Sequence, residues 1–395
     1  MLRGALKPSC AIGGRSAVDR SAVDHSAVDR SAARGAELAQ RMRARPPARR
    51  ALELARRRQC AGRVTASIAT FVIPCCNGAA HVGATIASIL AQDRQDFDLL
   101  LVDDASTDDS VAVATAAAGS RLRVERHAQR LGLAANFAHA ASLVRTPYFC
   151  IAHQDDVYEP RYLARMVAAL AADPALALAH CSATAIDAKG NPIAAAAERF
   201  KRRLARRAAD ASAPELFRLL LRGNFICCPS VLFRRDAFAA VGGFDTRLSF
   251  ALDWDLWLRC TRAGRRIGTV LDPLLRYRRH LGNATREATH TLRRFEEELA
   301  VLQRARDEGC AAGLLAAATP IGKALRNNLV NEAFEDLLAG GKAGFAAKMA
   351  FLDAQTPDLR RDPFVVALRV LAKGGRAGVA ALAACRWLAL KAGLG

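Results

Sequence analysis

The sequence predicts an α/β protein in which helices flank a mostly parallel sheet, with a tail before this domain and a helical extension after it. Between Ile68 and Ser110, two short apolar runs bracket a segment whose apolar residues recur at helical spacing, as in a βαβ unit. Acidic or amide side chains follow the predicted strands directly. The hydrophobic content of 52%, beside 24% charged residues, is enough to bury a core.

The first two predicted strands are the apolar runs Phe71–Ile73 and Leu99–Val102. The first run leads to Cys76-Asn77-Gly78 and the second to Asp103-Asp104. Ligands of an open parallel sheet bind beyond the carboxyl ends of the strands, so both clusters stand where a small molecule would bind. Asp and Asn after a strand are also ordinary turn and helix-capping residues. The ligand interpretation gains weight because a third cluster follows further along the chain.

The third predicted strand, Pro147–Ala152, ends at His153-Gln154-Asp155-Asp156. Two adjacent carboxylates at a strand end repel each other unless they share a cation. Carboxylate oxygens suit Mg²⁺ or Mn²⁺, which keep water ligands and bridge to the phosphates of a substrate. The sequence therefore predicts a divalent cation at this strand end.

The remaining pattern alternates helices and strands. Helices are expected from Asp108 to about Ala118, after the loop at 130–132, from Tyr158 to Asp173, shortly before Val241, from Asp253, over 292–306 and over 322–338, and strands over 122–125, 176–182 and 224–235. The basic stretch Arg199–Arg207 is expected to be exposed and mobile, with a binding role as the alternative.

The net charge of +20 is concentrated in part at the N-terminus, where residues 1–64 carry 15 Arg and Lys against 5 Asp and Glu. This segment contains three tandem pentads, beginning at Ser16, Ser21 and Ser26, and no aromatic residue. A five-residue period fits neither a helix nor a strand, so we expect a disordered, solvated tail. An electrostatic arm for anionic lipid or nucleic acid is the alternative, and the true start could be Met42. No apolar stretch typical of a secretory signal follows the first residues.

The eleven cysteines include no Cys-x-x-Cys pair and are not spaced with histidines as metal ligands. Free thiols in a reducing cytoplasm fit this pattern best. Residues 364–395 are apolar but interrupted by Arg and Lys, so no uncharged run reaches the roughly 18 residues of a membrane span. This segment is expected either to pack on the preceding domain or to lie on the inner face of the plasma membrane as a peripheral helix.

Four short motifs in order resemble the family 2 glycosyltransferases of the GT-A fold. They are Ile73-Pro74-x-x-Asn77, Val102-Asp103-Asp104-x-Ser106-x-Asp108, Gly132-x-x-x-Asn136 and Gln154-Asp155-Asp156. The resemblance covers residues 68 to about 285. It implies a Rossmann-like GT-A catalytic domain over 65–290, between the tail at 1–64 and a C-terminal helical region at 291–395.

The resemblance also implies roles for individual residues. The donor nucleotide would be bound by Pro74, Asn77, Asp103, Asp104 and Asn136; the metal by Asp155, Asp156 and His280; and the diphosphate by Arg278. Asp253, which from the sequence alone is also a plain helix N-terminal carboxylate, matches the aspartate that acts as general base in the family. Cys76 replaces a usual aromatic residue and His153 a usual acid, so we expect a loosely held Mg²⁺ or Mn²⁺, completed by the diphosphate.

The implied activity is inverting transfer of one sugar from a UDP-, dTDP- or GDP-sugar to a cell-surface polysaccharide, lipopolysaccharide or lipid-linked acceptor. The Gln-x-x-Arg-Trp signature of processive family members is missing, which favours the addition of a single sugar. Two alternatives remain open from the sequence. One is a basic nucleic-acid-binding protein, suggested by the charge, although a nucleic-acid partner is not expected; the other is a degenerate family member that binds nucleotide without turnover.

Overall fold

The computed structural model of the chain describes residues 66–193, 196–280, 291–317, 319, 321, 323–355, 363–374 and 378. By its internal contacts the chain divides into residues 1–65 and 66–395, and the second unit contains all described residues. The expected disordered tail lies outside the described residues. So does the end of the apolar C-terminal segment, from residue 379 onward.

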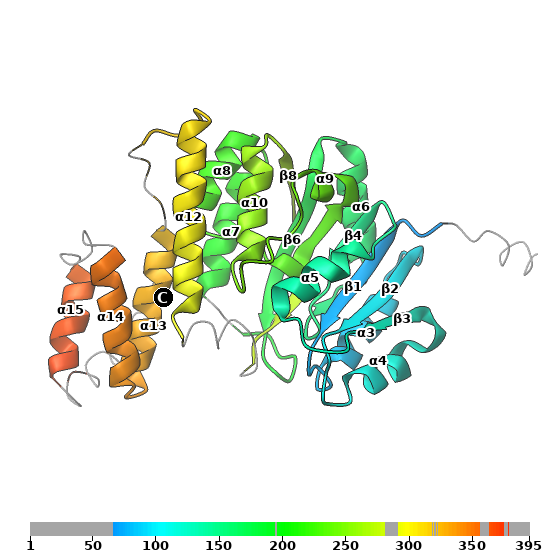
Figure 1. The fold of residues 1–395 in the computed structure, drawn as a ribbon, viewed down its shortest axis with the longest axis horizontal. Coiled ribbons are helices and arrows are strands. Elements are labelled where there is room, and N and C mark those ends of the chain that lie inside the picture. Colours follow the sequence, from blue (N-terminus) through cyan, green and yellow to red (C-terminus); the bar gives the residue numbers. More distant parts are fainter. Residues whose placement is uncertain are drawn as a thin grey trace, which may run out of the picture. The chain divides into compact units, whose positions relative to one another are not determined.

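The described residues form one eight-stranded sheet in the order β3-β2-β1-β4-β7-β6-β8-β5 (Figure 1). The strands are β1 (Ala69–Cys75), β2 (Phe97–Asp103), β3 (Leu122–Arg126), β4 (Tyr148–Ile151), β5 (Val157–Tyr158), β6 (Leu176–Ile186), β7 (Val231–Arg234) and β8 (Arg266–Arg278). β7 runs antiparallel to β4 and β6, and β5 antiparallel to β8, while the other neighbouring strands are parallel. The predicted α/β class with a mostly parallel sheet is confirmed.

Helices cover both faces of this sheet. They are α3 (Val82–Leu90), α4 (Ser110–Ala118), α5 (Leu133–Ser142), α6 (Tyr162–Ala172), α7 (Ala196–Ala208), α8 (Ala213–Arg222), α9 (Arg235–Ala240), α10 (Leu252–Arg262), α12 (Arg293–Ala311), α13 (Lys323–Leu338), α14 (Lys342–Gln355) and α15 (Pro363–Lys373). Among the described residues, no helix has both the length and the apolar character required to cross a bilayer.

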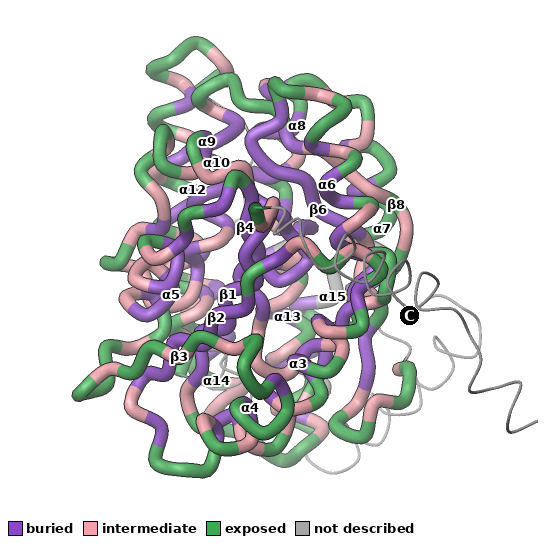
Figure 2. Tube along the Cα trace, turned by 90° about the vertical axis from the view of Figure 1, so that its right-hand side faces the viewer, coloured by how far each residue is buried: buried purple, intermediate pink, exposed green. Residues whose placement is uncertain are grey.

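The central strands are buried on both sides, as the buried tube of β1, β2 and β4 in Figure 2 shows. Successive side chains of a strand point to opposite faces. Phe71 and Ile73 of β1 therefore join a core cluster with α3 and α6, whereas Val72 joins another with α5, α8 and α10. This is why the first strand reads as a continuous apolar run rather than an alternating one.

The helices after β8 continue the second core cluster. Trp257 of α10 belongs to the same buried cluster as Phe295 and Leu302 of α12 and Leu329 of α13. In Figure 1, α12 runs alongside α10 and α8, and both pairs are in contact. The C-terminal helices thus share a core with one face of the sheet.

Several boundaries differ from the sequence prediction. The segment Arg199–Arg207, which was expected to be exposed and mobile, belongs to helix α7. Its arginines from 202 onward are exposed as expected, but Leu204 and Ala205 are buried. A helix was expected from Tyr158, but Val157–Tyr158 pairs with β8 as β5 and α6 begins at Tyr162. α8 and α14 were not predicted.

Long-range pairing and amphipathic packing explain these differences. A two-residue strand carries no periodic pattern of its own and forms only because β8 lies beside it. The sequence of α7 contains so many arginines that its narrow apolar face could not be recognised. The structure shows this face, because Leu204 and Ala205 are buried.

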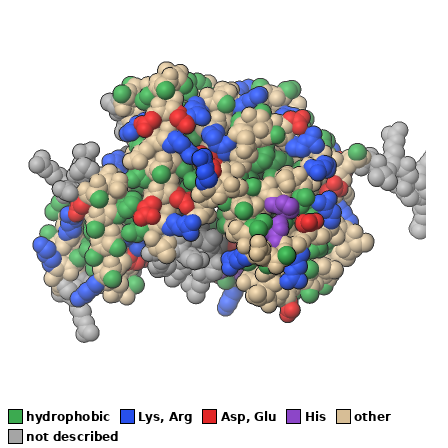
Figure 3. All heavy atoms as spheres, in the orientation of Figure 1, with side chains coloured by type: hydrophobic (Ala, Val, Ile, Leu, Met, Phe, Trp, Pro, Cys, Tyr) green, Lys and Arg blue, Asp and Glu red, His purple; other side chains and the backbone are tan. Residues whose placement is uncertain are grey.

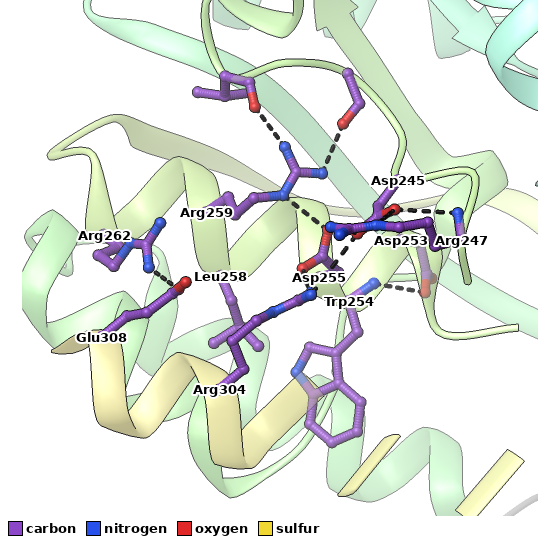
Figure 4. Close-up of polar contacts among 12 residues, drawn as sticks. Asp245, Arg247, Asp253, Trp254, Asp255, Leu258, Arg259, Arg262, Arg304 and Glu308 are labelled. Atoms are coloured by element: carbon purple, nitrogen blue, oxygen red, sulfur yellow. Dashed lines mark hydrogen bonds and ion pairs between the residues drawn. The ribbon is translucent and has the colours of Figure 1, made fainter. Parts of the chain in front are cut away.

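A polar network joins α10 to α12 (Figure 4). The buried carboxylate of Asp255 accepts from Arg259 Nε at 2.7 Å and from Arg304 Nη2 at 2.5 Å. Arg259 also donates to the carbonyls of Val241 and Gly243, so the loop before α10 is held as well. One helical turn further along, Arg262 pairs with Glu308 at a more exposed position.

We expect Asp255→Asn to destabilise the fold far more than Arg262→Gln, although each breaks an ion pair between the same two helices. Asp255 has only 3% of its side chain exposed, so its loss leaves two guanidinium groups without their buried counter-charge and costs about 3 kcal/mol. The exposed pair contributes less than about 1 kcal/mol. Urea unfolding of both variants measures the difference, and equal losses would contradict the assignment.

Candidate active site

A cavity of about 1510 Å³ opens beyond the carboxyl ends of β1, β2 and β4 and continues along α10, α12 and α13. Of the site residues predicted from the sequence, Pro74, Asp104, Asn136, Asp155, Asp253 and His280 line this cavity. Asn77, Asp103, Asp156 and Arg278 are not among its lining residues. The described chain therefore brings carboxylates from β2, β4 and α10 to one hollow, as expected for the edge of a parallel sheet.

The loop after β1 is fixed by the side-chain amide of Gln154, which follows β4. Gln154 Oε1 accepts from the Cys76 amide at 2.9 Å, and Gln154 Nε2 donates to the Cys76 carbonyl at 3.2 Å. A Cβ on Gly78 would lie 2.4 Å from Gln154 Oε1, so only glycine permits this approach. Asn77, at φ +52°, accepts from the Thr107 amide and thereby holds the same loop to the loop after β2.

The acidic pair after β2 has two different environments. The side chain of Asp104 faces the cavity, and its two oxygens accept from the backbone amides of Leu131 at 2.6 Å and Gly132 at 2.9 Å. Asp103 is fully buried, accepts from the Ser106 amide and lies 3.1 Å from Arg126 Nε. Asp104 thus shapes the cavity wall directly, and Asp103 supports the loop behind it.

Asn136 joins α5 to β2. Its Nδ2 donates to the Val102 carbonyl at 3.3 Å, and its Oδ1 lies 3.2 Å from His127 Nε2. The residue is 3% exposed. These contacts fix the start of α5 against the sheet at the rim of the cavity.

Possible metal ligands gather after β4. One ligand atom from each of His153, Asp155 and Asp156 lies within 4.8 Å of the others. Asp155 Oδ2 is 2.9 Å from His280 Nε2, which comes from the end of β8. Asp156 Oδ1 accepts from the Arg278 amide at 2.8 Å, while its Oδ2 and His153 Nε2 are buried without a hydrogen-bond partner among the described residues.

The two carboxyl groups of this cluster have opposite pKa shifts. Burial raises the pKa of Asp156 well above its usual range, and the neighbouring Asp155 charge raises it further. Burial also acts to raise the pKa of Asp155, but the hydrogen bond from His280, with a smaller contribution from His153, outweighs it and lowers the pKa. Burial lowers the pKa of His153, which keeps its ring neutral and able to bind a cation. Unpartnered buried oxygen and nitrogen atoms beside an ionised carboxylate fit a divalent cation.

Asp253 lies in the first turn of α10 and faces the cavity. Its Oδ1 accepts from the Trp254 amide at 2.6 Å, and its Oδ2 accepts from Asn224 Nδ2 at 3.3 Å. Burial raises the pKa of Asp253 to about 6, with a smaller raising effect from Glu298 and a lowering effect from Lys201. This carboxylate is therefore ionised at neutral pH yet basic enough to take up a proton.

Residues 70–242 match the family model described as Glycosyl transferase family 2. This stretch of the chain is therefore a glycosyltransferase family 2 domain. The predicted family and the predicted transferase activity are thus confirmed. The match ends before α10, so Asp253, Arg278 and His280 of the transferase lie beyond it.

Curated relatives agree with this assignment. An uncharacterized glycosyltransferase of Rickettsia prowazekii is 25% identical over 231 residues, which are 58% of this chain and 70% of that protein. A PGL/p-HBAD biosynthesis glycosyltransferase of Mycobacterium bovis is 27% identical over 201 residues, 50% of this chain and 71% of the relative.

A solved structure shares the fold. The crystal structure of S. aureus TarS 1-349 is 15% identical with a TM-score of 0.50, and the match covers 82% of this chain and 91% of that one. The same TarS fragment has been solved in complex with UDP-GlcNAc, at a TM-score of 0.48. A longer TarS crystal structure is covered over 38% of its length. The match to TarS 1-349 at a TM-score of 0.50 supports the GT-A fold of the transferase.

The loop that precedes α10 in the transferase is anchored from α12. Glu297 accepts from the backbone amides of Ser249, Phe250 and Ala251, at 2.7 to 3.2 Å, and from the Ser249 hydroxyl. These four groups end a loop whose next helical turn carries Asp253. The position of this carboxylate therefore depends on α12, which lies outside the matched family region.

Arg278 is placed differently from a phosphate ligand on the cavity surface. Its Nε donates to the Asp155 carbonyl at 2.7 Å and its Nη1 to the carbonyls of Asp187 and Ala188. The residue is 5% exposed, and it ties β8 to the loop that carries Asp155. Its neighbour Arg279 lines the cavity instead.

Sequence reasoning missed several lining residues of the transferase. His153 was read only as a replacement for an acid, although its ring nitrogen lies in the metal-ligand cluster. Lys201 and Glu298, which both affect Asp253, were not singled out. The cavity wall formed by α13 could have been inferred from the motif Asn327-Asn328-x-x-Asn331-Glu332. Residues four apart share a helix face, so this motif places four polar side chains on one side of the helix.

Proposed function

We propose that this transferase moves a single sugar from a nucleotide-diphosphate sugar to a hydroxyl group of a glycan or lipid-linked acceptor, with inversion and with a divalent cation. The observation that carries the proposal is the lining of one cavity by Asp104, Asp155 and Asp253, three carboxylates from separate parts of the chain. The catalytic domain is proposed to span 65–290, and the helical region 291–395 to add a wall to it.

The donor nucleotide is proposed to bind at the β1 and β2 end. An ionised carboxylate has about four lone-pair positions, so Asp104 can accept from a ribose hydroxyl or a base while it holds the amides of Leu131 and Gly132. Pro74 and Asn136 line the same end of the cavity. Asn77 and Asp103 would act indirectly, because their contacts fix the loops that shape this end.

The cation is proposed to bind among His153, Asp155 and Asp156. A bound Mg²⁺ or Mn²⁺ would neutralise the charge that develops on the departing diphosphate. The chain contributes the orientation, because His280 contacts one oxygen of Asp155 and the Arg278 amide fixes one oxygen of Asp156. Arg279 and Lys201 line the cavity as further positive charges for the diphosphate.

Asp253 is proposed as the general base. Inversion needs one displacement, in which the acceptor oxygen attacks the anomeric carbon while a carboxylate receives the hydroxyl proton. Asn224 and the Trp254 amide hold the two oxygens of Asp253 in place for this transfer. Its raised pKa matches the proton affinity that a base at neutral pH requires.

The proposed acceptor is a cell-surface or lipid-linked glycan. The relative named for PGL/p-HBAD biosynthesis supports a role in building a cell-surface or lipid-linked glycan. A nucleic-acid partner is less well supported, since basic and acidic side chains are interspersed on the face drawn in Figure 3 rather than gathered in one basic patch.

We expect Asp253→Asn to lower the metal-dependent hydrolysis of UDP-, dTDP- or GDP-sugars by about 10²- to 10⁴-fold, because water also needs a base when it serves as acceptor. Binding of the nucleotide should stay unchanged. Asp236→Asn, which removes a carboxylate exposed on α9, is the control. If Asp253→Asn retains full turnover, the base assignment fails; a wild-type chain that binds nucleotide but hydrolyses no donor would favour the degenerate alternative.

The pH dependence of turnover should follow the ionisation of Asp253. We expect the rate to rise with pH up to a plateau above about pH 6 and to fall about tenfold per pH unit on the acid side. Lys201→Met should move the midpoint to higher pH, since the lysine charge lowers the pKa of Asp253. Lys189→Met, in an exposed turn, should leave the midpoint unchanged, and a downward shift in Lys201→Met would contradict the model of the site.

Metal binding can be measured apart from turnover. We expect Asp155→Asn to weaken the binding of Mn²⁺ by at least about tenfold. Removal of a residue that only orients a metal ligand already lowers metal affinity by about 10- to 100-fold, and Asp155 is proposed to be a ligand itself. Electron paramagnetic resonance titration with Mn²⁺ reports the free ion. Asp93→Asn, an exposed carboxylate outside the cavity, is the matched control. Equal affinity of the two variants would place the cation elsewhere.

A further inference from the structure

The cavity extends past Asp253 along helices that lie beyond the matched family region. α12 contributes Arg294 and Glu298 to its wall, and α13 contributes Asn328, Asn331 and further polar residues. The proposed donor and metal groups lie at the other end, after β1, β2 and β4. The proposed base Asp253 therefore lies between the donor end and the α12–α13 end of the cavity. The α12–α13 end has room for the acceptor.

Glu298 carries an unmet hydrogen-bonding group in this part of the cavity. The residue is 5% exposed, and its Oε1 accepts from Arg294 Nε at 2.9 Å. Its Oε2 is buried and has no hydrogen-bond partner among the described residues. An unpartnered buried carboxylate oxygen is costly, so its presence in a cavity wall points to a hydroxyl or amide donor on a ligand.

Glu298 lies within electrostatic reach of the proposed base. Its charge contributes to the raised pKa of Asp253, and both side chains line the same cavity. A ligand that donates to Glu298 Oε2 therefore lies beside the carboxylate that receives the acceptor proton. This location fits the acceptor rather than the nucleotide.

The wall around Glu298 favours a neutral, hydroxyl-rich ligand. Arg294 is paired with Glu298, and Arg293 Nε lies 3.5 Å from Glu297 Oε1, so the basic groups of α12 are balanced by acids of the same helix. Asn328 and Asn331 face the cavity from α13, and an amide offers both donors and an acceptor. Phe250 adds an apolar ring that is half-buried at the cavity wall.

We propose that the α12–α13 part of the cavity is the acceptor subsite and binds a neutral oligosaccharide, with Glu298 accepting from one sugar hydroxyl and the asparagines of α13 contacting the next sugar. This inference rests on the proposed function of the same cavity. It assigns recognition of the acceptor to the helical region after residue 290 rather than to the domain that binds the donor.

The test measures the affinity of the full chain for a panel of short neutral oligosaccharides, by surface plasmon resonance in the presence of Mn²⁺ and UDP. Glu298→Leu removes both oxygens at similar side-chain size and should weaken binding about tenfold. Asn331→Ala changes an exposed residue, so the fold should be retained, and it should weaken binding about fivefold. Thermal unfolding checks that Glu298→Leu is folded.

Two matched variants complete the experiment. Glu335→Leu and Gln303→Ala change exposed residues of α13 and α12 outside the cavity, and they should bind oligosaccharide like the wild-type chain. Unchanged affinity in Glu298→Leu and Asn331→Ala would overturn the acceptor subsite. Affinity for anionic phospholipid vesicles without any for oligosaccharides would overturn it too.

The two levels of the proposal fail differently. A wild-type chain that hydrolyses a nucleotide sugar with Mn²⁺ but binds no oligosaccharide of the panel overturns the subsite and leaves the proposed transferase reaction standing. A chain that neither hydrolyses nor binds any nucleotide sugar overturns the proposed function itself.

Discussion

The site depends on hydrogen bonds that hold the loops after β1, β2 and β4 to one another. Gln154 clamps both backbone groups of Cys76, and Asp104 clamps the amides of Leu131 and Gly132. Each clamp pairs one side chain with two backbone groups, which fixes orientation as well as distance. Loops that follow parallel strands would otherwise be free to move, and the carboxylates they carry could not hold a common geometry.

This arrangement also explains how acidic groups can be crowded at the sheet edge. Asp103 lies beside Arg126 and a backbone amide, and Asp156 accepts from the Arg278 amide. Positive charges and backbone dipoles thus offset part of the repulsion, while burial and, to a smaller extent, the neighbouring charge of Asp155 raise the pKa of Asp156. The raised pKa means that Asp156 binds a proton more tightly than an isolated carboxylate does. Carboxylates that serve only to form a turn do not require this property.

The sequence was sufficient to predict the parallel strands β1, β2 and β4 and the helices between them. Each of these three strands is a buried apolar run that stops at polar residues, and the four short motifs between Ile73 and Asp156 carried the family resemblance. Prediction failed where structure depends on a partner: β5 exists only beside β8, and α7 hides its apolar face among arginines. Glu298 Oε2, which has no hydrogen-bond partner in the described part of the chain, could not be predicted, because a helix with Glu at three successive positions indicates an exposed surface.

The two neighbouring acids of α12 show how the C-terminal helices enter the site. Residues next to each other on a helix point about 100° apart, so Glu297 reaches the loop before α10 while Glu298 faces the cavity. The first carboxylate fixes the backbone that leads to Asp253, and the second lies close enough to raise its pKa. Any displacement of α12 would therefore change the position and the proton affinity of the proposed base together. Asp255 of α10 and Arg304 of α12 form an ion pair between the same two helices. The contact between α10 and α12 therefore affects both the stability of the fold and the position of the proposed base.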